Sequence, residues 1–163
     1  MLRSHRMYII ELSGVGSIAM ADNFQIEIMD WQTGRKALSA VRRDVFIMEQ
    51  GVPEEIELDD RDIRCTHALG LLNGTPVACG RLVPDGHIGR VAVVAAYRGR
   101  GYGKAVMCEL IDLARDRGME KIGISSQLQA LPFYETLGFT PVGEEFMEAG
   151  IAHRKMVLIL TAD

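Results

Sequence analysis

The chain has 163 residues, 48% hydrophobic and 25% charged, which suits one globular domain with a single core. Its formal net charge of −4 supplies no basic field for nucleic acid, and no run approaches the ~20 apolar residues that span a membrane. We therefore expect neither nucleic acid nor membrane as a partner. The three cysteines, Cys65, Cys79 and Cys108, lie far apart and form no CxxC pair. This spacing argues against a bound metal or a disulfide framework and indicates reduced thiols in a cytoplasmic protein.

The N-terminal segment 1–22 is expected to be a loosely ordered extension, followed by one domain over residues 23–163. Arg3 and Arg6 precede a semi-apolar stretch, an arrangement that loosely resembles a signal peptide. Glu11 and Gly14 interrupt that apolar stretch, so an extension is favoured over an export signal.

The sequence pattern of the first half of the domain predicts one strand, one helix and three consecutive antiparallel strands. Apolar and polar residues alternate over 24–29, which predicts a strand, whereas apolar spacings of three and four over 34–48 predict a helix. An acidic segment at 54–62 (EEIELDDRD) follows. The turn signals Asn73-Gly74 and Asp85-Gly86 then connect three predicted antiparallel strands, at 67–72, 76–83 and 88–94.

The second half predicts two helices and three strands. An amphipathic helix over 104–117 ends at Gly118, and a shorter helix over 130–137 has Pro132 in its first turn. Strands are predicted at 121–126, 142–148 and 154–160. The strand–helix–strand order around 104–117 implies a right-handed crossover and a parallel strand pair. The fold class is therefore α/β (α+β in some schemes), with a single mixed, mostly antiparallel twisted sheet and helices on both faces.

A glycine-rich loop, AYRGRGYGKA at 96–105, precedes the first of these two helices. A P-loop would need glycine where Arg98 stands and a hydroxyl residue where Ala105 stands, and a Rossmann loop would need GxGxxG instead of GxGxG. Successive backbone N–H groups from Arg98 to Lys104, next to the positive end of a helix, suit a pyrophosphate. A glycine-rich turn without a ligand is the alternative.

Two stretches resemble the GNAT superfamily of N-acetyltransferases. Val91-Ala92-Val93 followed by Arg98-Gly99-Arg100-Gly101-Tyr102-Gly103 is similar to its acetyl-CoA signature, and 127–139 (QLQALPFYETLGF) is similar to its later motif. The resemblance covers about residues 24–160. The stretch 45–50 (VFIMEQ), with Asp59, Asp62 and His67, further resembles the branch often called ElaA-like or YjcF-like.

The resemblance implies a GNAT-like acyl-CoA N-acyltransferase fold and transfer of an acetyl group from acetyl-CoA to an amine of a small molecule by direct attack. Tyr134 matches the tyrosine beside the departing sulfur, and the backbone N–H of Val93 matches the oxyanion donor. The cofactor-binding positions that the resemblance implies are Val91, Val93, Arg98, Gly99, Arg100, Gly101, Tyr102, Gly103, Lys104, Gln127 and Tyr134. A homodimer is a possible assembly. The alternative is a non-catalytic acyl-CoA-binding sensor or interaction module.

The sequence leaves the general base and the acceptor open. Gly89 and Arg90 stand where some family members carry a catalytic glutamate. Glu49 and His153, the acids around Glu57 and bulk water remain as candidates, and each of these side chains has an ordinary structural alternative. The acidic segment either attracts a cationic amine or is a solvated loop. Two arginines at 81 and 90 suggest instead a carboxylate-bearing acceptor.

Overall fold

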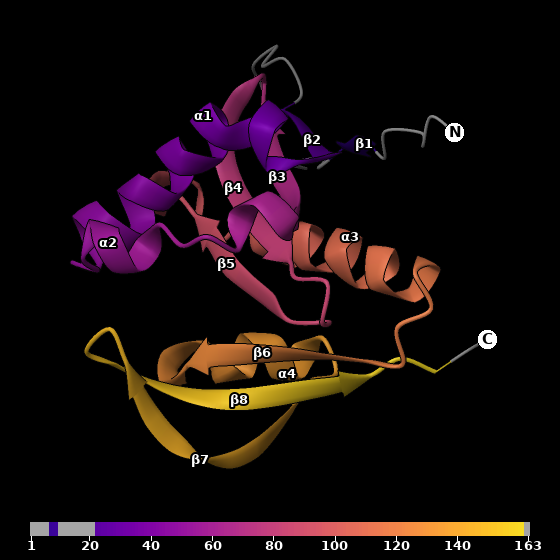
Figure 1. The fold of residues 1–163 in the computed structure, drawn as a ribbon. Coiled ribbons are helices and arrows are strands. Elements are labelled where there is room, and N and C mark those ends of the chain that lie inside the picture. The colour runs from indigo at the N-terminus through magenta and orange to yellow at the C-terminus, as the bar shows by residue number, and fades with distance from the viewer. Residues whose placement is uncertain (1–6, 10–21, 162–163) are drawn as a thin grey trace, which may run out of the picture.

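Eight strands form two antiparallel sheets in the computed structural model, which describes residues 7–9 and 22–161 (Figure 1). The five-stranded sheet has the order β1-β2-β3-β4-β5, with strands β1 (Met7–Ile9), β2 (Asn23–Met29), β3 (Thr66–Leu72), β4 (Thr75–Leu82) and β5 (Ile88–Val93). The three-stranded sheet has the order β6-β8-β7, with strands β6 (Lys121–Gln127), β7 (Thr140–Glu148) and β8 (Ile151–Ile159). Of the expected extension 1–22, residues 1–6 and 10–21 lie outside the described residues. Residues 7–9 pair with β2.

The two sheets meet where β5 and β6 begin. His87 and Gly123 form an isolated parallel bridge, and the N–H of Gly123 donates to the carbonyl of Gly86 at 3.0 Å. Beyond this bridge the two strands belong to separate sheets, so the expected parallel pair is present only at its start. The α/β fold class is confirmed: the strands are mostly antiparallel, with one parallel junction. The expectation of a single sheet is wrong, because β5 and β6 separate after this junction and the strands form two sheets. The gap between β5 and β6 positions the candidate site.

Four α-helices connect these strands within the described residues: α1 (Trp31–Arg42), α2 (Glu54–Glu57), α3 (Tyr102–Asp116) and α4 (Leu131–Thr136). Helix α1 begins three residues before the predicted start because the Asp30 carboxylate accepts from the N–H of Thr33 at 2.8 Å and caps it. It continues as a π-helix over Arg43–Glu49, which brings the chain to the edge of the gap. Short 3₁₀ helices occupy Asp62–Arg64, Ala95–Tyr97 and Leu128–Ala130.

Helices α1 and α3 cover opposite faces of the five-stranded sheet. Leu38 and Val41 of α1 pack against Leu69 and Cys79, whereas Val106 and Leu110 of α3 belong to the cluster that contains the neighbouring residues Ala68 and Ala78. Side chains of adjacent strand residues point to opposite faces, so this division follows from the strand period of two. Burial of these apolar side chains supplies most of the favourable free energy of folding.

Candidate active site

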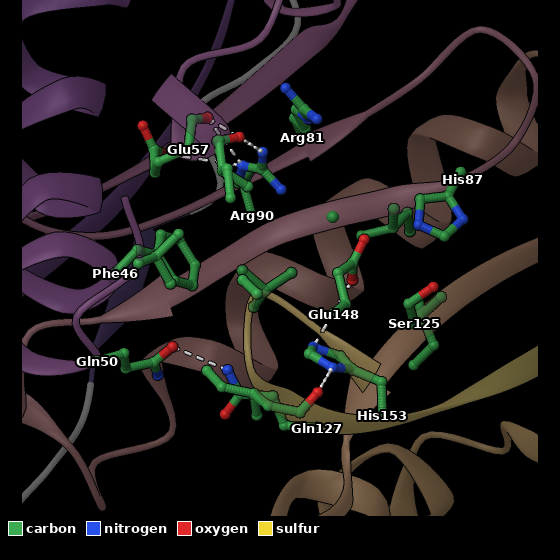
Figure 2. Close-up of a pocket in the computed structure, with 18 of the residues that line it drawn as sticks. Phe46, Gln50, Glu57, Arg81, His87, Arg90, Ser125, Gln127, Glu148 and His153 are labelled. Atoms are coloured by element: carbon green, nitrogen blue, oxygen red, sulfur yellow. Dashed lines mark hydrogen bonds and ion pairs between the residues drawn. The ribbon is translucent and has the colours of Figure 1, made fainter. Parts of the chain in front are cut away.

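A cavity of about 490 Å³ opens between β5 and β6 (Figure 2). Phe46 of the π-helix and Ile56 of α2 line one side. Tyr134 of α4 and His153 of β8 line the opposite side. Segments far apart in the sequence therefore form one cleft, which we call the β5–β6 cleft.

The glycine loop turns on two residues that adopt positive φ. Gly99 has φ +78° and Gly101 has φ +85°, and a Cβ on either would meet open space, so backbone geometry is what requires glycine there. The N–H of Ala105 donates to the carbonyl of Gly101 at 3.0 Å, which opens the hydrogen-bond ladder of α3. The N–H groups of Tyr102, Gly103 and Lys104 precede that ladder, at the positive end of a 15-residue helix. This geometry fits a phosphate group.

The side chains of the loop differ from one another in burial and in their contacts. Tyr102 is buried and stacks on Phe24 with ring centroids 4.1 Å apart, so only its backbone can contact a ligand. Arg100 lies over the ring of Tyr97 at 5.6 Å. Arg100 and Lys104 are exposed at the loop and can add positive charge beside a phosphate.

Arg98 ties the loop to two neighbouring elements. Its Nη1 and Nη2 lie 2.6 and 2.7 Å from the two carboxylate oxygens of Glu49, and its Nε donates to the carbonyl of Val93 at 2.9 Å. The hydrogen bonds from Arg98 lower the pKa of Glu49. The structure thus places Glu49 in an ion pair with the loop, and Glu49 does not line the β5–β6 cleft.

The N–H of Val93 points away from β4. Val93 lies opposite Ala78, and the next residue, Val94, donates to the carbonyl of Val77 at 2.9 Å. In an antiparallel ladder this makes Val93 and Ala78 a pair that exchanges no hydrogen bonds, so the backbone groups of Val93 face the other side. That side is the gap toward β6. Val91, two residues earlier, lines the β5–β6 cleft directly.

Tyr134 lies in the cleft against two phenylalanines. The ring centroid of Phe133 is 5.0 Å away and that of Phe139 is 6.0 Å away, and both pairs pack edge to face. Burial raises the pKa of the Tyr134 phenol to about 12. The hydroxyl therefore stays protonated at neutral pH and can donate a hydrogen bond.

Gln127 links the two sides of the gap. Its Nε2 donates to Oε1 of Gln50 at 2.8 Å, and its own Oε1 accepts from Nε2 of Gln129 at 2.6 Å. Gln127 and Gln50 both line the cleft, so this amide contact spans it at the ends of β6 and the π-helix.

The acidic segment 54–62 is folded into a charge network, and the expectation of a solvated loop is wrong for two of its acids. Glu57 and Asp62 are 3% and 2% exposed. Arg42, 1% exposed, contacts the carboxylate of Glu57 through Nε and that of Asp62 through Nη1 at 2.8 Å. Burial would raise the pKa of Asp62, but hydrogen bonds and charge from Arg42 and Arg81 lower it. A buried guanidinium therefore pairs with two buried carboxylates, and Oδ2 of Asp62 is left without a hydrogen-bond partner.

Two further arginines complete this network from the sheet. Nη1 and Nη2 of Arg81 contact the two oxygens of Asp59 at 2.8 and 2.7 Å. A β-bulge in β5 places Arg90 at φ +52°, and its Nη2 donates to the carbonyls of Ile56 and Glu57 at 3.2 and 3.1 Å. The arginines thus hold the α2 segment in place as one wall of the cleft. His67 supports the network, because its Nε2–H donates to the carbonyl of Asp62 at 2.9 Å.

A histidine and a glutamate meet in the β7–β8 hairpin (Figure 2). Nδ1 of His153 lies 2.6 Å from the carbonyl of Ile151, and because a carbonyl can only accept, Nδ1 carries the proton. The lone pair of the neutral ring is then on Nε2, which lies 3.8 Å from Oε2 of Glu148. Ala149 and Gly150, both at positive φ, form the tight turn that sets Glu148 opposite Ile151.

Sequence reasoning missed Glu148 and His87 as residues of the site. The strong turn at Ala149-Gly150 could have indicated that Glu148 lies beside the start of β8. His87 lines the cleft at the bridge to Gly123, and burial lowers its pKa. The sequence offered no signal for it, because its place depends on the junction between the two sheets.

This topology, with a loop that fits a phosphate group beside a gap between two strands, is similar to that of a solved acyl-CoA N-acyltransferase. A sequence model of the acetyltransferase (GNAT) domain matches residues 47–160. The chain is 36% identical over 121 residues to the uncharacterized N-acetyltransferase YjcF of Bacillus subtilis, covering 72% of this chain and 86% of YjcF. The chain belongs to the GNAT acetyltransferase family.

Solved structures agree with this assignment. The crystal structure of Escherichia coli ElaA superimposes with a TM-score of 0.74 and 27% identity, covering 81% of this chain and 97% of ElaA. An acyl-CoA N-acyltransferase from Pseudomonas aeruginosa gives a TM-score of 0.74 and 26% identity, covering 82% and 98% of the two chains. The resemblance read from the two sequence motifs is thereby confirmed.

Two further observations concern metals and membranes. Within residues 7–9 and 22–161, no group of three or more His, Cys, Asp or Glu side chains is arranged to hold a metal ion. None of the helices in the same residues has the length and apolar character needed to span a membrane.

Proposed function

We propose that this protein transfers an acetyl group from acetyl-CoA to the amine of a small molecule by direct attack of the amine on the acetyl carbon. The observation that carries the proposal is proximity: Tyr134 and His153 line the β5–β6 cleft, and the N–H of Val93, on β5 two residues after the cleft residue Val91, points away from β4 toward the gap between β5 and β6. Backbone N–H groups of the loop, from Gly99 to Lys104, would hold the pyrophosphate of acetyl-CoA.

Val93 has the role of stabilising charge on the acetyl oxygen. Negative charge develops on that oxygen as the amine attacks, and a backbone donor in a water-poor site is worth about 2.7–4 kcal/mol. The direction of the Val93 N–H, away from β4 and toward the gap, supports this assignment.

His153 has the role of general base. An amine with a pKa near 10.4 must lose a proton before it attacks, which costs roughly 4–5 kcal/mol at pH 7. Nε2 of His153 presents a lone pair to the cleft, and Glu148 at 3.8 Å stabilises the imidazolium that forms. Glu49 is the weaker candidate, because its carboxylate is bound by Arg98 outside the cleft lining.

Tyr134 acts as a hydrogen-bond donor to the departing sulfur. With its pKa at about 12, full proton transfer to a thiolate near 8.5 would be uphill by about 5 kcal/mol, so donation without transfer is favoured. The ammonium nitrogen gives one proton to His153, which later releases it to water. The N–C bond forms and the C–S bond breaks, the second nitrogen proton passes to water, and the thiolate takes up a proton from water. The products are the amide, the CoA thiol and one released proton.

The test is release of CoA thiol from acetyl-CoA across a panel of amines, with His153→Gln as the matched variant. We expect release with at least one amine and a loss of at least 100-fold in kcat for His153→Gln, largest below pH 8 where little free amine is present. Tight CoA binding with no release from any amine would instead indicate a non-catalytic acyl-CoA sensor.

A further inference from the structure

We propose that the acceptor end of the cleft selects a cationic aliphatic amine that carries no carboxylate, such as an alkyl diamine or a guanidino-alkylamine. This inference rests on the transferase function proposed above and adds the chemical class of its acceptor. Three observations carry it: the state of the arginines, the position of Glu148 and the apolar wall.

The two arginines that line the cleft from the sheet are already occupied. Arg81, 4% exposed, shares Nη1 and Nη2 with Asp59, and its Nη1 also lies 2.8 Å from Asp62. Nη2 of Arg90 is divided between two backbone carbonyls of the α2 segment and Asp59 at 3.3 Å. Nε of Arg81 is buried without a partner, and within residues 22–161 Nη1 of Arg90 forms no hydrogen bond. A substrate carboxylate that bound either guanidinium through both Nη atoms would still have to displace Asp59, and at Arg81 also the buried Asp62.

The charges of this network also balance. Arg42, Arg81 and Arg90 face three carboxylates, those of Glu57, Asp59 and Asp62. The cluster therefore presents little net charge to the cleft, although its sequence is strongly acidic. The charge that meets an incoming substrate must come from other residues of the lining.

Glu148 is the carboxylate that remains available. Its side chain is 59% exposed and lines the cleft, and within residues 22–161 it lies 3.8 Å from Nε2 of His153 and forms no ion pair with an arginine. His153 is nine-tenths buried, and the lone pair of its neutral ring is on Nε2. The Glu148 carboxylate attracts an ammonium group, whose proton His153 can then accept, whereas it repels a second carboxylate.

The wall opposite this pair is apolar. Phe46, Val52 and Ile56 line it, and Ile56 is 49% exposed. Methylene groups between the reacting amine and a second polar group would cover this surface and remove it from water, and affinity should rise with each methylene buried. The wall therefore favours an aliphatic chain over a compact polar acceptor.

The experiment compares amino acids with their decarboxylation products as acceptors: lysine with cadaverine, ornithine with putrescine, and arginine with agmatine. Thiol release at saturating acetyl-CoA gives kcat/KM for each. We expect each decarboxylated member to exceed its amino acid at least tenfold. Equal or better use of the amino acids would overturn the proposal.

Three variants locate the source of the selectivity. Glu148→Gln should reduce the cadaverine-to-lysine ratio of kcat/KM at least threefold, whereas His153→Gln should lower both substrates together and keep the ratio. Arg61, an exposed cation of the cleft lining, provides the control, because Arg61→Ala should leave the ratio unchanged. A ratio that depends on Arg61 and not on Glu148 would contradict the assignment.

A different experimental result would show that the proposed transferase function is wrong. If acetyl-CoA binds but no amine causes thiol release, the transferase proposal fails. Saturation-transfer NMR then measures the binding of the same amines and amino acids to the CoA-loaded protein, and so tests the acceptor selectivity without turnover. Lysine that binds as tightly as cadaverine in that measurement would overturn the inference about the acceptor.

Discussion

The proposed acetyl-CoA (donor) side of the site, which lies beside the β5–β6 cleft, and the acceptor side, which lines the cleft, are built by different means. The donor side consists of backbone: two glycines at positive φ, the free N–H groups that open α3, and the outward-facing N–H of Val93. The acceptor side consists of side chains that come from β4, β5, α2 and the β7–β8 hairpin. A backbone site keeps its chemistry when side chains change, whereas a side-chain site can be altered by single substitutions. The difference teaches that one common donor can be kept while the acceptor varies.

The largest effect, on the free energy of unfolding, is expected from replacing one arginine of the buried charge network. Arg42→Met removes the guanidinium that contacts both Glu57 and Asp62. Only Arg81, 2.8 Å from Asp62, and Arg90, 3.7 Å from Glu57, then remain beside these buried carboxylates, so the free energy of unfolding should fall by about 3–5 kcal/mol. Urea unfolding measures the change. The neighbour Arg43 pairs with Glu54 at 3.3 Å on the surface, and Arg43→Met should change it by less than about 1 kcal/mol. Equal losses for the two variants would show that the network is not the stabilising feature.

The donor side should respond to a backbone change. Gly101→Ala places a Cβ on a residue at φ +85°, which costs about 1–2 kcal/mol and distorts the loop. We expect CoA affinity, measured by calorimetry, to fall at least fivefold. Gly118→Ala imposes a similar strain (φ +73°) at the other end of α3 and should lower stability while keeping CoA affinity. Loss of affinity in both variants would argue against a specific role for the loop.

A substitution at Tyr134 tests whether its hydroxyl contributes to turnover without contributing to acetyl-CoA binding. Tyr134→Phe removes the hydroxyl and keeps the edge-to-face contacts with Phe133 and Phe139, so we expect kcat to fall at least tenfold with little change in the Kd of acetyl-CoA. Because the pKa of the phenol is about 12, the wild-type rate should show no loss from its ionisation up to about pH 10. Unchanged turnover in the variant would remove Tyr134 from the mechanism.

The smallest effect is expected on the pH dependence of the free energy of unfolding, through Asp59 in the wall of the cleft. Burial would raise the pKa of Asp59, but hydrogen bonds and charge from Arg81 and Arg90 lower it to about 2, below the 3.9 expected for an unfolded chain. A lowered pKa contributes stability above about pH 4, and this is lost as the pH falls toward 2. Unfolding free energies across this window should fall more steeply for the wild type than for Asp59→Asn. Parallel curves would contradict the prediction.

The donor side was predictable from sequence because its determinants are local. The glycine loop and the helix after it lie within about twenty residues, and the positive φ values occur at glycines that the sequence displays. The sequence left open whether the acidic segment attracts a cationic amine or is solvated, and its buried ion pairs were not predicted because their partners are distant: Arg42 lies 15 residues before Glu57, and Arg90 lies 31 residues after Asp59. Pairing at such distances depends on the tertiary fold, and charge patterns along the chain do not reveal it.

The segment predicted as one helix over 34–48 consists of an α-helix followed by a π-helix. Its apolar spacing continues at three and four through Val45 and Met48, but the chain switches to a π-helix at Arg43. Gln50 donates to the carbonyl of Val45 at 3.1 Å, an i to i−5 bond that apolar spacing alone does not distinguish from an α-helical turn.

This π-helix offers a means of changing the acceptor wall by length. Its wider turns hold about one residue more than α-helical turns would, so deleting a single residue within 43–49 would restore α-helical winding with little rotation of the residues after the deletion. The deletion would change which side chain of this segment lies at the position of Phe46 in the cleft lining, while the part of α1 that packs on the sheet would keep its place. A change of length at this point is therefore a route to a different acceptor wall that leaves the core and the glycine loop intact.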